Sequence, residues 1–322
     1  MHAPLLTRSD IEATQRRINQ HVHRTPVLRS GTIDGMIGAA VLFKCENLQK
    51  VGAFKIRGAL NAAACMSPEE RRRGLATHSS GNHGQAVALA ARLAAVPAFI
   101  VMPRSAPRIK RAAVDGYGAT VIECGTAIQD RESTMRAVLA EVGAAFIHPY
   151  DDERVIAGQA TVAMELFEDD EGLDALLAPI GGGGLMSGSC LATRAFSPRT
   201  VLYGCEPAGA NDAARSLAAG TLLQNAEVST IADGLRTNLS ARTFAILQRH
   251  LSDIITVSDA EIIAAMRLIF ERLKVVVEPS AAVPFAALMQ QRRRFAGKRV
   301  GIILSGGNID LEQPYFTRPP SG

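Results

Sequence analysis

Short apolar segments alternate with longer helical patterns along most of this chain, and that alternation limits the folds open to it. In the first half the pattern predicts strands at 75–78, 98–102, 120–124 and 144–148, with helices near 82–95, 107–117 and 126–142. The second half repeats it, with strands at 175–180, 201–206, 253–257 and 299–305. Strands that are separated by helices pair in parallel, with the helices as crossovers. The sequence therefore predicts an α/β fold with two open, twisted, mostly parallel sheets that carry helices on both faces.

The length and charge of the chain indicate how many domains it has and which partners it could bind. A chain of 322 residues is longer than one hydrophobic core usually supports, so two domains are expected. The formal net charge of +4 comes from 35 basic and 31 acidic side chains spread along the chain. The densest basic runs, at 71–73 and 292–294, lack the interleaved aromatic residues of an RNA site. No apolar run approaches the roughly 20 residues that a membrane span needs. We therefore expect no nucleic-acid partner and no membrane partner.

The cysteines predict a reducing compartment. Their number is odd and none forms a C-x-x-C pair, which fits free thiols better than a disulfide framework. The N-terminus also has no apolar signal segment, so a cytoplasmic protein is expected. The five cysteines are Cys45, Cys65, Cys124, Cys190 and Cys205.

One lysine has an unusual neighbourhood. Lys55 lies between Phe54 and Ile56 in the segment V-G-A-F-K-I-R-G-A-L-N. Burial among apolar side chains lowers the pKa of an ammonium group and leaves the neutral amine free to attack an aldehyde. A lysine near the start of a helix can instead extend its ammonium group to solvent. The segment therefore admits either a Schiff-base lysine or an ordinary surface lysine.

Two glycine-containing turns each follow a predicted strand and precede a helix. The first, H-S-S-G-N-H-G at 78–84, brings hydroxyl and backbone N–H groups to a helix start, which favours an anion such as a carboxylate. A capping serine with glycines for a tight turn explains this segment equally well. The second turn is four consecutive glycines at 181–184, whose N–H groups can surround one phosphate. A flexible linker is a poor explanation there, because linkers do not normally separate a strand from its crossover helix.

Two further turns carry polar side chains. In S-G-G-N at 305–308, Ser305 could share a hydrogen bond with a neutral ring nitrogen, although most such sequences are only turns. Between 205 and 212, two carboxylates and an intervening carbonyl could bind a hard divalent cation. The spacing alone favours a simpler explanation, a helix-capping aspartate and a solvent-exposed glutamate.

Taken together and in this order, several segments resemble the serine/threonine dehydratase and serine racemase family of fold-type-II pyridoxal-phosphate enzymes. They are F-K-I-R-G-A, H-S-S-G-N-H-G-Q-A, V-I-A-G-Q-A-T-V-A-M-E, G-G-G-G-L, I-A-D-G-L, V-E-P-S-A-A-V and L-S-G-G-N. The resemblance covers residues 11 to 311, and the set is far more specific than any one segment. It implies a large cofactor-binding domain of residues 1–73 and 152–322 and a small substrate-side domain of residues 74–151.

The resemblance implies pyridoxal 5'-phosphate as the cofactor, held by a Schiff base to Lys55. Phe54 would pack against the cofactor ring, and Asn82 would bind the ring hydroxyl. Ser305 would face the pyridine nitrogen, and Glu278 lies close to the cofactor in relatives. The phosphate would rest on the backbone of Gly181, Gly182, Gly183 and Gly184.

A substrate site and a metal site are also implied by the resemblance. Arg131 and Asp233 match substrate-side positions, and Ser80 matches the serine that acts as the second acid of racemases. The residues expected around the substrate carboxylate are Ser79, Ser80, Gly81, Asn82 and His83. The residues that match a divalent-metal site of racemase-like members, for magnesium or calcium, are Glu206, Ala210 through its carbonyl, and Asp212. Relatives are commonly homodimers, so a homodimer is expected.

The activity implied is the β-elimination of a 3-hydroxy L-amino acid such as threonine or serine, which gives a 2-oxo acid and ammonia. Serine racemisation and 3-hydroxyaspartate dehydration stay open as alternatives, and Arg131 favours the latter if it reaches the site. A β-replacement synthase is a weaker alternative, because His83 and the Lys55-Ile56-Arg57 context differ from such enzymes. A non-catalytic cofactor-binding module is weaker too, because no catalytic residue is missing. Since the chain ends soon after the Ser305 turn, we expect no regulatory domain and no isoleucine feedback.

Overall fold

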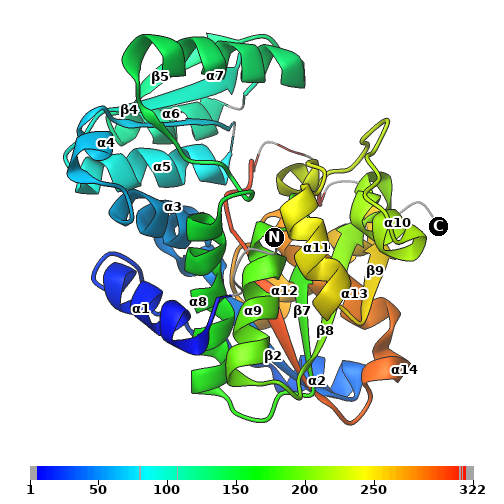
Figure 1. The fold of residues 1–322 in the computed structure, drawn as a ribbon. Helices are drawn as coiled ribbons and strands as arrows, with labels where there is room; N and C mark the ends of the chain where they lie inside the picture. Colours follow the sequence, from blue (N-terminus) through cyan, green and yellow to red (C-terminus); the bar gives the residue numbers. More distant parts are fainter. Residues whose placement is uncertain (1–5, 80, 107, 312, 314, 317–322) are drawn as a thin grey trace.

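The computed structural model describes residues 6–79, 81–106, 108–311, 313, 315 and 316. Within these residues the strands form two sheets, an upper one in cyan and teal and a lower one that combines blue, green, yellow and orange strands (Figure 1). The strands are β1 (Val27–Leu28), β2 (Ala40–Cys45), β3 (Leu75–His78), β4 (Ala98–Pro103), β5 (Thr120–Cys124), β6 (Ala145–Phe146), β7 (Ala175–Pro179), β8 (Val201–Pro207), β9 (Asp253–Val257) and β10 (Arg299–Leu304).

The lower, six-stranded sheet is parallel except at one edge. Its order is β1-β2-β10-β7-β8-β9, and among the described pairs β1 alone runs antiparallel to its neighbour. β10 comes from the end of the chain and lies between β2 and β7, with Arg299 opposite Ala40 and Leu304 opposite Cys45. The predicted fold class, two mostly parallel sheets in an α/β protein, is confirmed.

The upper, four-stranded sheet has the order β5-β4-β3-β6, and its described pairs are all parallel. Its last strand is shorter than predicted, because β6 covers Ala145–Phe146 and not 144–148. The chain turns at His148, whose ring Nδ1 accepts the backbone N–H groups of Tyr150 at 3.3 Å and Asp151 at 2.8 Å. The chain therefore leaves the sheet after Phe146, and Pro149 and Tyr150 lie outside the strand.

Helices connect the strands as crossovers. Several begin at side-chain caps, and Thr7 and Asp10 exchange hydrogen bonds in the same reciprocal way as Ser258 and Glu261. The α-helices are α1 (Arg8–Ile18), α2 (Gly31–Ile37), α3 (Lys55–Ala64), α4 (Pro68–Arg72), α5 (Asn82–Leu93), α6 (Arg108–Gly116), α7 (Ile128–Val142), α8 (Glu153–Asp169), α9 (Gly184–Phe196), α10 (Asp212–Ala219), α11 (Ala241–His250), α12 (Asp259–Leu273), α13 (Pro279–Gln290) and α14 (Arg292–Phe295). The short 3₁₀ helices are η1 (Glu46–Leu48), η2 (Lys50–Gly52), η3 (Ala208–Ala210) and η4 (Asp233–Leu235).

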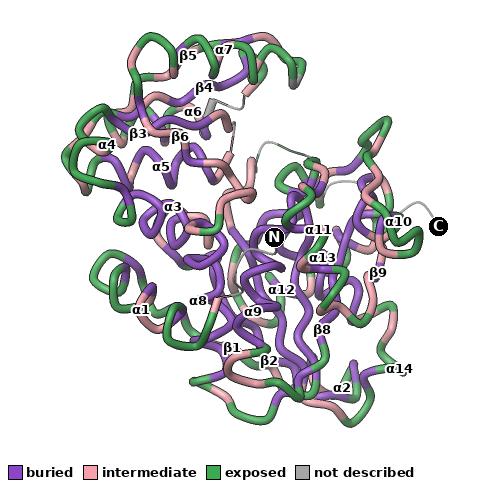
Figure 2. The backbone as a smooth tube through the Cα atoms, viewed as in Figure 1, coloured by how far each residue is buried: buried purple, intermediate pink, exposed green. Residues whose placement is uncertain are grey.

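The six-stranded sheet is covered on both faces. Along β2, Val41 and Phe43 pack with side chains of α12 and α13, whereas Leu42 points to the other face and packs with side chains of α8 and α9. Figure 2 shows the strands and these inner helices as buried and the outer loops and helix ends as exposed. Strands covered on both faces are expected to be almost wholly apolar, as β7 and β10 are.

Helix α3 lies where the two halves of the molecule meet. It packs against α8 on one side and against α5 of the four-stranded sheet on the other. Ile56 and Ala59 of α3 share one apolar cluster with Leu75 of β3 and Val87 of α5. The strands of the upper sheet all fall between Leu75 and Phe146. The domain bounds at 73/74 and 151/152 stay a prediction.

The structure also shows the state of the cysteines and whether a described helix could cross a membrane. Each of the five cysteines is free, and Cys65 is the exposed one. Within the described ranges, the structure contains no helix long and apolar enough to cross a bilayer.

Candidate functional site

Lys55 begins helix α3 at the carboxyl edge of the six-stranded sheet. Just before it, Ala53 forms an isolated bridge with Gly306, and the N–H of Phe54 donates to the carbonyl of Ser305 at 3.1 Å. The turn that follows β10 is therefore held against the residues that precede the lysine. Phe54 and Ser305, both predicted to contact a cofactor, lie beside Lys55.

The surroundings of the Lys55 amine favour its neutral form more than water does. Its Nζ donates to the carbonyl of Pro149 at 2.8 Å and lies 5.1 Å from the centre of the Phe54 ring. Burial lowers the pKa of Lys55 to about 8, although the charge of Glu278 opposes the shift. A substantial fraction of the amine is then neutral just above neutral pH, which suits attack on an aldehyde.

The four glycines 181–184 fill the connection between β7 and α9. Gly183 caps the helix with a φ of 85°, in the left-handed region that favours glycine. A Cβ atom on Gly182 would lie 2.2 Å from the ring of Tyr150, and one on Gly184 would lie 2.9 Å from the Tyr150 side chain. Tyr150 follows Pro149, which binds Lys55. The lysine and the glycine turn therefore meet at one two-residue segment, next to the positive end of a 13-residue helix.

Asn82 and Glu278 bind each other across the site. The side-chain amide of Asn82 donates to both carboxylate oxygens of Glu278, at 2.9 and 3.1 Å. Burial raises the pKa of Glu278 to about 7, the charge of Asp233 adds to the shift, and the bond from Asn82 opposes it. Because Asn82 is the first residue of α5, this contact joins the upper half of the molecule to the lower half.

Ser79 and Gly81 lie in the connection between β3 and helix α5, and His83 lies in the first turn of that helix. The hydroxyl of Ser79 accepts the N–H of Gly81 at 3.2 Å, and Gly81 caps helix α5. His83 is buried and points to the carbonyl of Ile147, at 3.0 Å from its Nε2. Burial lowers the pKa of His83 well below its usual value, so the ring is neutral and donates through Nε2. Ser80, predicted as a catalytic and substrate-binding residue, lies outside the described residues.

Arg131 of α7 lies near His78, at the carboxyl end of strand β3 in the upper sheet. Burial lowers the pKa of His78 at the end of β3, and the charge of Arg131 lowers it further. The His78 ring centre is 6.5 Å from that of His148, whose pKa burial lowers to about 4, with a smaller contribution from the charge of Lys55. The two imidazoles are therefore neighbours, and the charge of Arg131 acts on the ring of His78 while that of Lys55 acts on the ring of His148. The Nε atom of Arg131 is buried and has no hydrogen-bond partner among the described residues.

Asp233 of η4 is engaged by a lysine that the sequence analysis did not single out. Lys110 of α6 forms a hydrogen-bonded ion pair with the Asp233 carboxylate. The Lys110 side chain is almost fully buried, while that of Asp233 is 41% exposed. Lys110 therefore links the upper half of the molecule to the lower half close to Glu278.

A buried ion cluster anchors the first turn of α3. Arg57 donates to Glu46 at 2.8 Å and to Glu165 of α8 at 2.7 Å, and Lys44 of β2 donates to Glu165 at 2.7 Å. These four side chains have no exposed surface. Burial alone would lower the pKa of Arg57, but the two glutamates together raise it, and Arg57 with Lys44 lowers the pKa of Glu165 against its burial. Two cations balance two anions, so the cluster is neutral as a whole.

The predicted metal residues lie together at the end of β8. The carboxylate of Glu206 accepts the N–H groups of Ala213 at 3.2 Å and Ala214 at 2.8 Å, while Asp212 accepts the N–H of Leu239 at 2.8 Å. Burial raises the pKa of Glu206 to about 8, and the charge of Asp212 adds to the shift. In the described part of the chain, no group of three or more His, Cys, Asp or Glu side chains could hold a metal ion. A cation here would need backbone oxygen atoms as well, such as the predicted carbonyl of Ala210.

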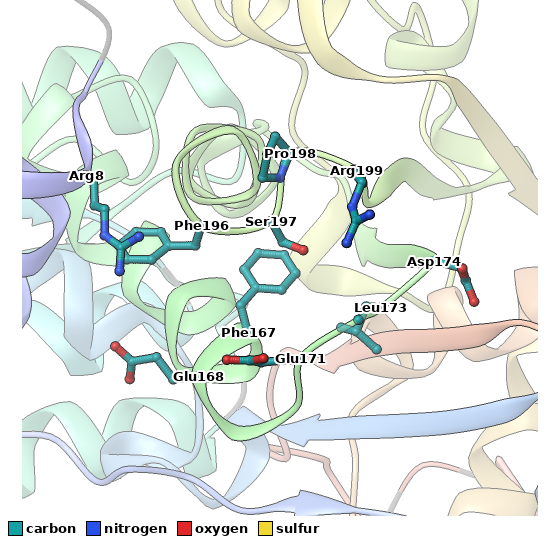
Figure 3. A pocket seen from close by; sticks show the side chains of 11 residues that line it. Arg8, Phe167, Glu168, Glu171, Leu173, Asp174, Phe196, Ser197, Pro198 and Arg199 are labelled. Atoms are coloured by element: carbon teal, nitrogen blue, oxygen red, sulfur yellow. The ribbon is translucent and has the colours of Figure 1, made fainter.

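A surface cavity of about 680 Å³ is lined by none of these residues, and Figure 3 shows the side chains that do line it. Asp174 and Arg199, which line it, come just before β7 and β8, at the amino ends of the strands. Its charges are mixed, and the guanidinium of Arg8 packs on the ring of Phe196 at 4.7 Å. Ligands of open α/β sheets bind at the carboxyl ends of strands, so we place the functional site at Lys55 and not in this cavity.

Sequence reasoning missed several residues of the site. Pro149 and Tyr150 follow the predicted strand 144–148, and their position after a strand of a parallel sheet was the signal that could have found them. Asn308 stood in the S-G-G-N segment without a role. Lys110 had no local signal at all. The structure brings together Phe54, Lys55, Asn82, Glu278, Ser305 and the four glycines, with Ser79, Gly81 and Asp233 at the margin.

Comparisons with known proteins agree with this arrangement. The model of the family described as pyridoxal-phosphate dependent enzyme matches residues 18–306. The beta-hydroxyaspartate dehydratase of Paracoccus denitrificans is 47% identical over 307 residues, which cover 95% of this chain and 98% of the relative. The L-threo-3-hydroxyaspartate ammonia-lyase of Saccharomyces cerevisiae is 48% identical over 308 residues, which cover 95% and 94%. The structure of maize serine racemase aligns with a TM-score of 0.94 at 43% identity and covers 96% of this chain and 95% of that one. The resemblance drawn from the sequence segments is confirmed.

Proposed function

This chain belongs to the family of pyridoxal-phosphate-dependent enzymes, and on that premise we propose that it is an ammonia-lyase that acts on 3-hydroxyaspartate. The products would be a four-carbon 2-oxo dicarboxylic acid and ammonia. The relatives support this substrate better than threonine or serine, which the sequence analysis put first. The relatives reported above are a beta-hydroxyaspartate dehydratase, an L-threo-3-hydroxyaspartate ammonia-lyase and a serine racemase.

We base the choice of 3-hydroxyaspartate as the substrate on the position of Arg131. A dicarboxylic substrate needs a cation for its second carboxylate, beyond the groups that hold the first one. Arg131 lies close enough to His78 to lower its pKa, and its buried Nε has no partner among the described residues. A buried donor without a partner is costly, and a carboxylate would supply a charge-assisted hydrogen bond. Threonine and serine have no group that could do so.

The residues around Lys55 fit pyridoxal phosphate. Lys55 is half-buried, and partial burial lowers the pKa of its amine to about 8. The glycine turn, where Cβ atoms on Gly182 or Gly184 would overlap Tyr150, borders the same segment. Lys55 would hold the aldehyde carbon, and residues 181–184 would hold the phosphate at the start of α9. Asn82 and Ser305 would hold the ring hydroxyl and the pyridine nitrogen. When bound, the cofactor withdraws electrons from Cα of the amino acid joined to it and makes the Cα proton acidic.

The protein would then take the Cα proton of the substrate and hold each of its two carboxylates. Nζ of Lys55 takes the Cα proton, which a neutral amine with a pKa of about 8 can do. The N–H groups of the turn at 79–83 and the start of α5 hold the α-carboxylate, and Arg131 holds the second carboxylate. The 3-hydroxyl group would leave as water together with the proton that Lys55 takes from Cα, and the remainder of the substrate would be released as an enamine. The free enamine takes up water and releases ammonia, so that the atoms of 3-hydroxyaspartate balance those of the oxo acid and ammonia.

A substrate panel tests the proposal. Purified protein loaded with pyridoxal phosphate is given 3-hydroxyaspartate, threonine and serine, and oxo acid and ammonia are measured. We expect kcat/KM to be highest for 3-hydroxyaspartate, and equal or higher values for threonine would contradict the proposal. Chirality of the recovered substrate is measured in the same samples. Racemisation would need the second acid that the resemblance places at Ser80.

A magnesium or calcium ion at Glu206, Asp212 and the Ala210 carbonyl is part of the proposal. Two buried carboxylates at the end of one strand support it, because a cation would offset their repulsion. Calcium or magnesium should raise the thermal midpoint of the wild-type protein and leave that of Glu206→Gln unchanged. The homodimer and the cytoplasmic location stay predictions, and sedimentation equilibrium tests the first.

A further inference from the structure

Asn308 joins two segments of the site that are far apart in the sequence. Its side-chain Nδ2 donates to the carbonyl of Val51 at 2.6 Å and to Oδ1 of Asn82 at 2.9 Å. An amide nitrogen carries two hydrogens, and here each has its own acceptor. Val51 lies in the turn that leads into Lys55, and Asn82 begins α5. Asn308 therefore links the lysine turn to the upper half of the molecule.

The bond from Asn308 also decides which way the Asn82 amide faces. Because Oδ1 of Asn82 accepts from Asn308, its Nδ2 must face the other way, where it donates to both oxygens of Glu278. The reversed orientation would set two NH₂ groups against each other and the amide oxygen of Asn82 against a carboxylate. The backbone N–H of Asn308 also donates to Glu278 and lowers the pKa of that carboxyl against the larger effect of burial.

The local backbone is shaped around this asparagine. Gly52 has a φ of 67°, and a Cβ atom on it would lie 2.6 Å from Oδ1 of Asn308. Val51 adopts a left-handed φ of 58°, which is costly for a β-branched residue. A Cβ atom on Gly306 would lie 2.7 Å from Glu278 and 3.1 Å from the amide of Asn82. The chain thus accepts backbone strain and omits side chains where the Asn308 contacts are made.

We propose that Asn308 is a positioning residue. It fixes the orientation of the Asn82 amide, so that one N–H group is shared by the two oxygens of Glu278 and the other can serve the cofactor, and it holds Asn82 in register with the turn that carries Lys55. This role rests on the proposed function, in which Asn82 donates to the ring hydroxyl of pyridoxal phosphate. Asn308 touches neither the Lys55 amine nor the glycine turn in the contacts described above. It acts through Asn82 and Val51.

The test compares cofactor binding in Asn308→Ala, Asn308→Asp and a control, Asn47→Ala. Asn47 is also buried, packs near Gly307 and makes one side-chain bond, to the carbonyl of Val276 at 3.0 Å. Pyridoxal phosphate is titrated into each protein, and its visible absorbance band is followed against pH. Thermal midpoints of the cofactor-free proteins report general loss of structure.

Asn308→Ala should weaken cofactor affinity by about tenfold, the effect of one well-placed hydrogen bond. It should also raise the pH midpoint of the visible band by about half a unit, because the ionised ring hydroxyl loses a fixed donor. Asn308→Asp should have a larger effect, since its oxygens face the Val51 carbonyl and the Asn82 oxygen. Asn47→Ala should lower the thermal midpoint without moving the band midpoint. An unchanged band midpoint and affinity in Asn308→Ala would overturn the proposal.

A double-mutant cycle separates action through Asn82 from a structural effect. In the Asn82→Ala background, Asn308→Ala should change cofactor affinity by less than about twofold, because the amide that it orients is gone. A further tenfold loss in the double variant would contradict the positioning role. If wild-type protein shows no visible band with pyridoxal phosphate, the proposed function itself fails, and the role of Asn308 fails with it.

Discussion

The side-chain amine of Lys55 donates a hydrogen bond of 2.8 Å to the carbonyl oxygen of Pro149. The next residue, Tyr150, lies against Gly182 and Gly184 so closely that neither glycine could carry a side chain without displacement. The half-buried amine of Lys55 and the glycine turn at the start of α9 therefore contact the same two-residue segment, Pro149 and Tyr150. This geometry is what a cofactor with an aldehyde at one position and a phosphate at another requires.

Gly182→Ala should weaken the binding of pyridoxal phosphate by tenfold or more. The added methyl group would lie about 2.2 Å from the Tyr150 ring, and relief of such overlap costs roughly 1–3 kcal/mol. Equilibrium dialysis with the cofactor measures the change. Gly35→Ala in α2 is the matched control, because no atom lies within 4 Å of its added Cβ. Equal affinities for the two variants would count against a phosphate site in the glycine turn.

Arg131→Gln should lower kcat/KM for 3-hydroxyaspartate by about 10- to 100-fold, the loss expected for a hydrogen bond between charged groups. The values for serine should change little, since serine has no second carboxylate. Arg136→Gln, on the exposed side of the same helix, should leave both values near wild type. A parallel loss for both substrates would show that Arg131 does not select the dicarboxylic one.

The uptake of pyridoxal phosphate by the cofactor-free protein should accelerate with pH and level off above a midpoint near pH 8. The neutral amine is the reactive form, and burial lowers the pKa of Lys55 to about 8. The folded chain then binds fewer protons at Lys55 than the unfolded chain, so this residue makes stability rise with pH between about 8 and 10.5. Stopped-flow absorbance measures the rate. A rate that still climbs steeply at pH 10 would indicate an ordinary, solvated lysine.

Arg57→Met should destabilise the protein by about 3–5 kcal/mol, because it leaves two buried glutamates with Lys44 as their single cation in the cluster. Denaturant unfolding of the cofactor-free protein measures the free energy. Arg111→Met removes a solvent-exposed pair with Glu123 and should leave the unfolding free energy nearly unchanged. Similar results for both variants would mean that the buried cluster does not anchor α3.

Patterns local in sequence predicted much of the fold. The parallel strands were found because apolar runs and helical patterns alternate, and the predicted bounds agree with the structure to within two residues. β6 was predicted too long because the apolar run 144–148 gives no sign that His148 closes a turn through its own ring. The antiparallel edge strand β1, with two residues, has too little pattern to be found.

The candidate site was predictable where a residue type carries its own signal. The four glycines stand out because few other roles explain a glycine run between a strand and its crossover helix. The Lys55 segment alone also fits an ordinary surface lysine, and the other segments of the resemblance favoured the Schiff-base role. The roles assigned to individual residues remain predictions. Contacts between distant segments were not predictable: Lys110 pairs with Asp233, and Arg57 with Glu165, without any pattern that links them in sequence. Such pairs depend on how the two sheets are placed, which only the folded chain reveals.

Borohydride reduction of the protein with bound pyridoxal phosphate, followed by peptide mass mapping, tests the central claim most directly. The reduction converts a lysine–cofactor double bond into a stable amine and so marks the lysine that held the aldehyde. We predict one phosphopyridoxyl group per chain, on the peptide that contains Lys55, and none in Lys55→Ala. A label on Lys110, Lys44 or any other lysine, or no label in the wild-type protein, would contradict the account.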